Sequence, residues 1–141
     1  MQEQIFRVGV GALIVKDNKV LLGLRGLKAR DQHYKWELLG GLVEFGESLE
    51  EALVREVREE AGLEVKPGKI IGSNVRQSPD GKEQWVGITF QCDWKSGEPH
   101  RTEYDRVLEF GWHSLDEALE RDDLTPMTRY QLEQYRDWLK N

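Results

Sequence analysis

Residues 41–63, GLVEFGESLEEALVREVREEAGL, predict a helix with defined ends. Ser48 followed three residues later by Glu51 forms a capping box, in which each side chain satisfies a backbone amide of the other residue. Gly62 tolerates the left-handed backbone that commonly ends a helix. The sequence therefore predicts a helix over about 48–61, entered from a glycine-rich segment.

The apolar face of this helix carries carboxylates. With about 100° between successive residues, Leu49, Leu53 and Val57 fall on one apolar stripe. Glu56 and Glu60 fall in the middle of that stripe, where core side chains are expected. The charged residues expected on the outer side of the helix are Glu50, Glu51, Arg55 and Arg58.

A solvated, charge-rich helix face accounts for those outer residues, because oppositely charged side chains three or four positions apart stabilise a helix. It does not account for carboxylates on the core side, since a buried unpaired carboxylate is costly. An arginine partner would neutralise them. So would a hard divalent cation, to which the oxygens of Glu56, Glu59 and Glu60, expected to converge, are suited. The spacing favours Mg²⁺ or Mn²⁺, with a purely structural acidic helix as the alternative.

The same stretch matches the pattern G-x5-E-x7-R-E-U-x-E-E-x-G-U, in which U is a bulky aliphatic residue, at every fixed position. It resembles the signature, or box, of the Nudix hydrolase family, the MutT-type pyrophosphohydrolases. Arg25 in the strand ahead, and the residues Trp36-Glu37-Leu38-Leu39-Gly40-Gly41 leading into the box, extend the resemblance. The resemblance implies an α/β (α+β) fold, a Nudix-type α/β/α sandwich with a central mixed β-sheet, formed by a single domain over 1–141.

The resemblance also implies roles for individual residues of the Nudix box, 41–63, and of the glycine before it. The implied metal ligands are Glu56, Glu60, Glu59 and the carbonyl of Gly40. Glu59 is at the same time a candidate general base. Arg55 and Glu47 are implied to form an ion pair that orients the carboxylates, a supporting role that is common around metal ligands.

Candidate substrate contacts lie outside the box. The resemblance supports a contact between Arg25 and phosphate. Glu103 and Asp105 are candidates for a general base supplied by a downstream loop, as in some members of the family, and ordinary surface charge is the alternative for both. Trp85 faces away from the apolar side of its strand and is a candidate for lining a nucleobase pocket.

The rest of the sequence predicts strands with helices between and after them. Predicted strands cover 5–15, 19–25, 64–76, 83–94 and about 106–113, and further helices cover 115–120 and a segment capped by Thr125 with Pro126 at its first position. Residues 26–37 are predicted to form a loop, and Gly9 and Gly11 indicate a bulge or a close backbone approach. This order predicts an α/β or α+β sandwich.

Composition narrows the functional classes. Twenty Lys and Arg against 26 Asp and Glu give a net charge of −6, which disfavours a nucleic-acid polymer or an anionic membrane as partner. No apolar run approaches the ~20 residues of a membrane span, and the first residues lack a signal-peptide pattern. The single cysteine, Cys92, lies in an apolar strand pattern and is expected to be a buried thiol, which favours a cytoplasmic location.

For function, the resemblance implies Mg²⁺-dependent hydrolysis of a pyrophosphate bond in a nucleoside triphosphate or nucleoside diphosphate derivative, with Mn²⁺ as a substitute metal. Water activated by the metal would attack phosphorus. The alternatives are a nucleotide-sugar or ADP-ribose hydrolase on the same scaffold, and a non-catalytic nucleotide-sensing domain. The expected partner is a small-molecule nucleotide, and the expected state is a monomer or homodimer.

Overall fold

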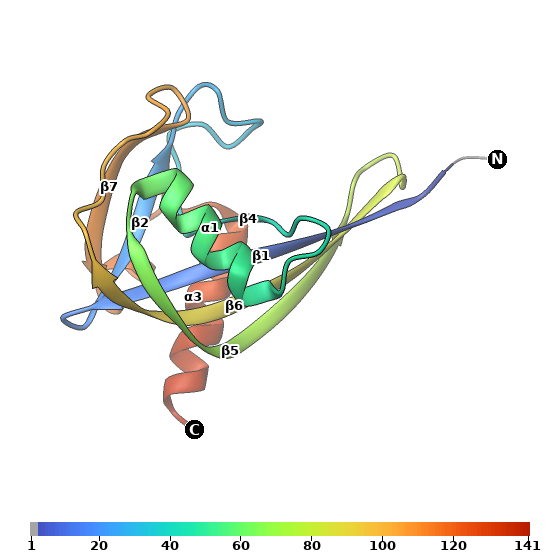
Figure 1. Ribbon diagram of the computed structural model, residues 1–141. Coiled ribbons are helices and arrows are strands. Elements are labelled where there is room, and N and C mark those ends of the chain that lie inside the picture. Colours follow the sequence, from blue (N-terminus) through green and yellow to red (C-terminus); the bar gives the residue numbers. More distant parts are fainter. Residues whose placement is uncertain (1–2) are drawn as a thin grey trace.

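The computed structural model describes residues 3–141 and shows a mixed β-sheet covered by helices on both faces (Figure 1). The elements in chain order are β1 (Ile5–Lys16), β2 (Lys19–Arg25), β3 (Trp36–Glu37), β4 (Leu39–Leu42), α1 (Leu49–Ala61), β5 (Glu64–Gln77), β6 (Glu83–Ser96), β7 (Val107–Ser114), α2 (Leu115–Glu120) and α3 (Pro126–Leu139). Five strands follow the order β3-β2-β1-β6-β5, while β4 pairs with β1 and β7 with β2. β1 and β6 are parallel and the other pairs are antiparallel. The predicted sandwich is confirmed.

Strand β1 contributes to both hydrophobic cores, because successive residues of a strand point to opposite faces of the sheet. Val10, Ala12 and Ile14 pack with α1, whereas Leu13 packs with residues of α2 and α3. In Figure 1, α1 lies in front of the sheet and α3 behind it. Cys92 is fully buried on the α1 side, and burial raises the pKa of its thiol to about 12. The prediction of a buried thiol is confirmed.

Helix α1 has the predicted ends. The Ser48 hydroxyl accepts a hydrogen bond from the amide of Glu51 at 3.1 Å, and the Glu51 carboxylate accepts one from the amide of Ser48 at 2.9 Å. Gly62 ends the helix with a left-handed backbone, at φ 69°. Leu53 and Val57 are fully buried, so the predicted apolar stripe faces the sheet.

One prediction about the segment before the helix needs correction. The segment 26–37, predicted as a loop, ends in strand β3, and Gly40 and Gly41 lie in strand β4, opposite Gly11 and Val10 of β1. A Cβ at Gly40 would collide with the carbonyl oxygen of Val10. Glycine therefore allows this close approach of β4 to β1, and its low strand propensity conceals the strand in the sequence.

Gly9 and Gly11 of β1 were predicted to mark a bulge or a close backbone approach, and Gly11 leaves room for a side chain of helix α3. Pairing of β1 with β6 is regular through Gly9 and Gly11, so the predicted bulge is not formed between these two strands. The predicted close backbone approach is found toward β4, where a Cβ at Gly40 would lie 3.1 Å from Cα of Gly11. Toward α3, a side chain comes close to Gly11 as well. A Cβ at Gly11 would lie 2.7 Å from Nε2 of Gln131 on α3, which donates to the Thr89 hydroxyl at 3.0 Å. This contact ties α3 to the middle of the sheet.

The two long helices are short by the standard of membrane spans. Helix α1 has 13 residues, and α3, which follows its predicted cap Thr125, has 14, against the ~20 that a bilayer requires. Within residues 3–141, no helix combines the length and the hydrophobicity needed to cross a membrane.

Candidate active site

The Nudix box brings strand β4 and helix α1 into contact. Glu56, in the middle of α1, places its carboxyl group against Gly41, where a Cβ would collide with it. Glu60, one turn later, accepts a hydrogen bond from the amide of Gly40 at 3.1 Å. The paired glycines thus form a stretch of strand without side chains, against which two carboxylates of the helix lie.

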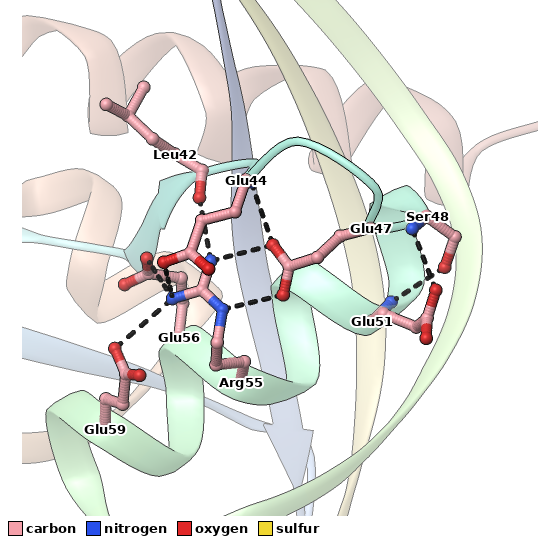
Figure 2. A network of polar contacts seen from close by, with 8 residues as sticks. All are labelled: Leu42, Glu44, Glu47, Ser48, Glu51, Arg55, Glu56 and Glu59. Atoms are coloured by element: carbon pink, nitrogen blue, oxygen red, sulfur yellow. Dashed lines mark hydrogen bonds and ion pairs between the residues drawn. The ribbon is translucent and has the colours of Figure 1, made fainter.

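Arg55 lies at the centre of the box (Figure 2). Its Nε and Nη2 donate to the two carboxylate oxygens of Glu47 at 2.7 and 2.9 Å, and Nη2 also donates to the carbonyl of Leu42 at 3.0 Å. Its Nη1 donates to Glu56 at 2.9 Å and to Glu59 at 3.3 Å. Only 22% of the side chain is exposed, so the prediction that Arg55 lies on the outer side of the helix is wrong. The ion pair with Glu47 that the resemblance implies is formed.

This ion pair keeps its charges over a wide pH range. Hydrogen bonds from Arg55, and a further one from the amide of Glu44, lower the pKa of Glu47 to about 2. The hydrogen bond to Glu47 is also the main cause of a raised pKa at Arg55. A bidentate guanidinium–carboxylate pair fixes orientation as well as charge. It therefore holds the segment before α1 against the helix.

Burial has the opposite effect on the two carboxylates beside β4. It raises the pKa of Glu60 to about 8; the charges of Glu37 and Glu56 add to the effect, while the hydrogen bond from Gly40 opposes it. Burial also raises the pKa of Glu56, against the hydrogen bond and charge of Arg55. Two desolvated carboxylates in one place are unfavourable in their charged forms unless a cation joins them.

These oxygen donors fit a hard divalent cation, because Mg²⁺ and Mn²⁺ bind carboxylate and carbonyl oxygens. The predicted convergence is not found, since no three His, Cys, Asp or Glu side chains within residues 3–141 lie close enough together to hold an ion. Arg55 binds Glu56 and Glu59, while Glu60 is bound to β4. Coordination of one ion by all three carboxylates would require their side chains to lie closer together than they do here.

Glu37, for which no role was predicted, belongs to the same group of carboxylates. It follows buried Trp36 in β3 and accepts hydrogen bonds from Nη1 of Arg25 at 2.9 and 2.8 Å. Burial raises the pKa of Glu37 in spite of Arg25. Glu37 and Glu60 both line a cavity of about 10 Å³, the size of one water molecule. A lone carboxylate between apolar Trp36 and Leu38 was the signal available in the sequence.

The predicted substrate contacts outside the box lie at the border of this group. Arg25 is already bound to Glu37 and to Asp31, whose carbonyl accepts from Nε at 2.8 Å. Glu103 and Asp105 are exposed. Between residues 3 and 141, no hydrogen bond or ion pair joins Glu103 or Asp105 to the box carboxylates. Their roles and that of Arg25 stay predictions.

Trp85, in β6, lies near two cations of the neighbouring strands β1 and β5. The guanidinium carbons of Arg7 and Arg76 are 5.8 and 5.2 Å from the centroid of its ring, within the range of cation–π attraction. The assignment of Trp85 to a nucleobase pocket stays a prediction.

A mixed sheet between helices, with paired glycines facing a helix rich in carboxylates, defines a class of α/β/α sandwich proteins with an acidic site beside the sheet. The chain belongs to the Nudix family, because the family model described as NUDIX domain matches residues 5–135. The resemblance seen in the box is thereby confirmed. Nudix hydrolases generally use a divalent metal, which agrees with the donor set described above.

Known proteins are similar to this chain in fold and in sequence. The structure is similar to that of the MutT NUDIX hydrolase from Burkholderia pseudomallei, with a TM-score of 0.81 and 35% identity, covering 93% of this chain and 98% of that one. An ADP-ribose pyrophosphatase of Methanocaldococcus jannaschii is 39% identical over 93 residues, 64% of this chain and 53% of the relative. A CTP pyrophosphohydrolase of Escherichia coli is 46% identical over 68 residues, 48% of this chain and 50% of the relative. The chain thus spans about half the length of these two curated relatives.

Proposed function

We propose that this protein hydrolyses a pyrophosphate bond in a nucleoside triphosphate or a nucleoside diphosphate derivative, with Mg²⁺ as its metal and Mn²⁺ as a substitute. The observation that carries the proposal is the pair of half-buried carboxylates, Glu56 and Glu60, against the strand of Gly40 and Gly41. Membership of the Nudix family supports it. So do the names of the two curated relatives, which specify ADP-ribose and CTP.

Each residue of the site has a distinct role in this proposal. The residues that would hold the metal are Glu56, Glu60, Glu59 and the carbonyl of Gly40. A metal bound there would lower the pKa of a water molecule and neutralise charge on the diphosphate. Glu59, which is 60% exposed and whose other carboxylate oxygen has no hydrogen-bond partner among the described residues, would be the general base. Arg55 and Glu47 orient the carboxylates.

Two alternative functions on the same scaffold can be told apart by which substrate, if any, the protein hydrolyses. A nucleotide-sugar or ADP-ribose hydrolase would use the same carboxylates on a different leaving group. The sequence similarity to the ADP-ribose pyrophosphatase of M. jannaschii favours ADP-ribose among these substrates. A non-catalytic nucleotide-sensing domain would need nucleotide affinity alone. The complete set of fixed positions in the Nudix box favours hydrolysis over sensing.

The test is a hydrolysis assay over a substrate panel with Mg²⁺ or Mn²⁺. The panel contains canonical, oxidised and methylated nucleoside triphosphates, ADP-ribose, nucleotide sugars and dinucleoside polyphosphates, with phosphate and pyrophosphate measured separately. We expect turnover of one class, abolished by EDTA and by Glu60→Gln. Glu50→Gln is the matched control, because Glu50 is exposed on the first turn of the same helix. Nucleotide binding without turnover would overturn hydrolysis and support the sensing domain.

We also propose the setting in which this activity operates. Residues 1–141 act as a single Nudix domain, as a monomer or homodimer, in the cytoplasm. The substrate is a small-molecule nucleotide, and neither a nucleic-acid polymer nor a membrane is a partner. The net charge of −6, the match over residues 5–135 and the buried position of Cys92 support this proposal.

A further inference from the structure

The segment 97–106, between β6 and β7, is fixed to the end of helix α1. The carbonyl of Ala61 accepts a hydrogen bond from the amide of His100 at 3.0 Å, and the carbonyl of Glu59 accepts one from the Thr102 hydroxyl at 2.6 Å. The ring of His100 occupies the space where a Cβ at Gly62 would lie. These contacts satisfy carbonyls that a helix end leaves without partners, and they place the segment beside the last turn of the box helix.

A second set of contacts fixes the same segment to the end of strand β2. The amide of Gly26 donates to the carbonyl of Arg106 at 2.8 Å, and the amide of Lys28 donates to the carbonyl of Asp105 at 2.9 Å. A Cβ at Gly26 would collide with that carbonyl of Asp105. Gly26 directly follows Arg25, the partner of Glu37. The segment that ends in Arg106 is therefore held between the end of α1, which carries Glu56 and Glu60, and the end of β2, next to Arg25.

The charge of Arg106 acts on those carboxylates from this position. It lowers the pKa of Glu37, Glu56 and Glu60, in each case against the larger effect of burial. Yet its side chain is exposed, and within residues 3–141 no carboxylate or other acceptor lies within hydrogen-bond or ion-pair distance of it. Arg106 is thus an exposed cation without an ionic partner among the described residues, on a backbone held beside the site.

The other two arginines of the site, Arg55 and Arg25, already bind carboxylates of the protein. Arg55 donates to three carboxylates and a carbonyl, and Arg25 binds Glu37 and Asp31. A diphosphate entering an acidic site of an acidic protein needs cations for the oxygens that the metal does not neutralise. A guanidinium group matches phosphate oxygens with two parallel donors.

We propose that Arg106 binds the diphosphate of the substrate, as a binding residue supplied by the segment between β6 and β7. This inference rests on the proposed function, since it assigns a cation to the same site. It makes a prediction that a structural role would not make. Removing a positive charge beside carboxylates strengthens their binding of a metal cation and weakens binding of a phosphate anion.

Arg106→Gln tests this opposition with two probes. Binding of Mn²⁺ alone is measured from the free-ion signal in electron paramagnetic resonance, and binding of ADP is measured by calorimetry at saturating Mn²⁺. We expect tighter Mn²⁺ binding, by about two- to fivefold, and weaker ADP binding, by about tenfold or more. The KM of the substrate should rise with the ADP dissociation constant, and Arg106→Lys should restore part of both.

Arg136→Gln is the matched control, because Arg136 lies on α3 and its removal changes the net charge equally. Arg106→Gln behaving like Arg136→Gln in both assays would overturn the inference. A loss of Mn²⁺ and ADP affinity together, with a lower Tm, would also overturn it by showing a structural role. The binding assays need no turnover, so an inactive wild-type protein would count against the proposed hydrolysis while Arg106 is still tested.

Discussion

Two arginine–glutamate pairs flank the carboxylates of the site, and their glutamates respond in opposite ways. Arg55 binds Glu47 through two hydrogen bonds of 2.7 and 2.9 Å, and Arg25 binds Glu37 through two of 2.8 and 2.9 Å. The pKa of Glu47 is nevertheless lowered to about 2, whereas the pKa of Glu37 is raised. Arg55 uses two nitrogens, Nε and Nη2, whereas Arg25 uses Nη1 alone. Both glutamates have an arginine partner, so the presence of that partner does not by itself decide the preference for the proton.

The exposed fraction of the side chain does not explain this contrast, because it is 19% for Glu47 and 32% for Glu37. The desolvation of a charge depends on protein and solvent well beyond its first contacts. Glu47 lies in the segment before α1, and hydrogen bonds dominate its pKa. Glu37 lies among the strands that line the cavity it shares with Glu60, and burial dominates. The surroundings, more than the partner, decide the charge.

The largest expected effect is a loss of kcat/KM that differs between substitutions of Arg55 and Arg25. Arg55→Gln should lower kcat/KM about a hundredfold, because it removes the one group that binds Glu47, Glu56 and Glu59 together. Arg25→Gln should lower it only about tenfold, because Glu37 can take up a proton when its partner is lost. Steady-state kinetics with the best substrate of the panel measures both.

Arg58→Gln is the control for the loss of an arginine from α1, since Arg58 pairs with exposed Glu64 away from the site. It should leave kcat/KM near that of the wild type. An Arg25→Gln variant impaired as much as Arg55→Gln would contradict the ranking. It would show instead that Arg25 leaves Glu37 to contact the reacting phosphates.

A smaller effect is expected from strand β4, against which the carboxyl group of Glu56 packs. Gly41→Ala places a methyl group into the carboxyl group of Glu56 and should turn that side chain away, lowering kcat/KM about tenfold or more. Gly9→Ala is the matched control on the neighbouring strand, because its Cβ would meet only the carbonyl of Gly41 at an ordinary 3.5 Å. Kinetics and Tm are measured for both. Equal losses from the two variants would show that strand distortion, not Glu56, is responsible.

The structural features that depend on local signals could be predicted from the sequence. Helix α1 was predicted with its capping box and its glycine end, because Ser48, Glu51 and Gly62 act within a few residues of one another. The pair of Arg55 and Glu47 followed from the family signature. Strands with alternating or apolar patterns were found within a few residues of their ends, since period-two burial is visible in one strand alone.

The parts that the sequence concealed depend on contacts distant along the chain. Strand β4 lacks a strand pattern because its glycines serve the approach of Val10 and Glu56. Helical periodicity gives the direction of a Cα–Cβ bond, but the long side chain of Arg55 reaches around the helix toward Glu47. The role of Arg106 depends on a segment fixed at two places by tertiary contacts, and no local pattern encodes such an arrangement.

The smallest expected effect tests the contrast between the two glutamates directly. A group with a lowered pKa stabilises the fold above its unfolded value of about 4.5, and this contribution is lost as the pH falls toward about 2. Glu47→Gln should therefore cost more stability at pH 7 than at pH 3. A group with a raised pKa contributes most at low pH and loses that contribution as the pH rises through its folded pKa. Glu37→Gln should therefore cost less at pH 7 than at pH 3.

Thermal unfolding at pH 3, 5 and 7 in EDTA measures both slopes, because the chelator keeps metal from altering the charge of the neighbouring carboxylates. The informative quantity is the difference in Tm between each variant and the wild type at the same pH. For Glu47→Gln the loss of Tm should grow with pH, since the ionised carboxylate is what Arg55 binds. For Glu37→Gln it should shrink or change sign, since the folded protein favours the protonated form. Slopes of the same sign would mean that Arg25 outweighs burial at Glu37, and that the two pairs are equivalent after all.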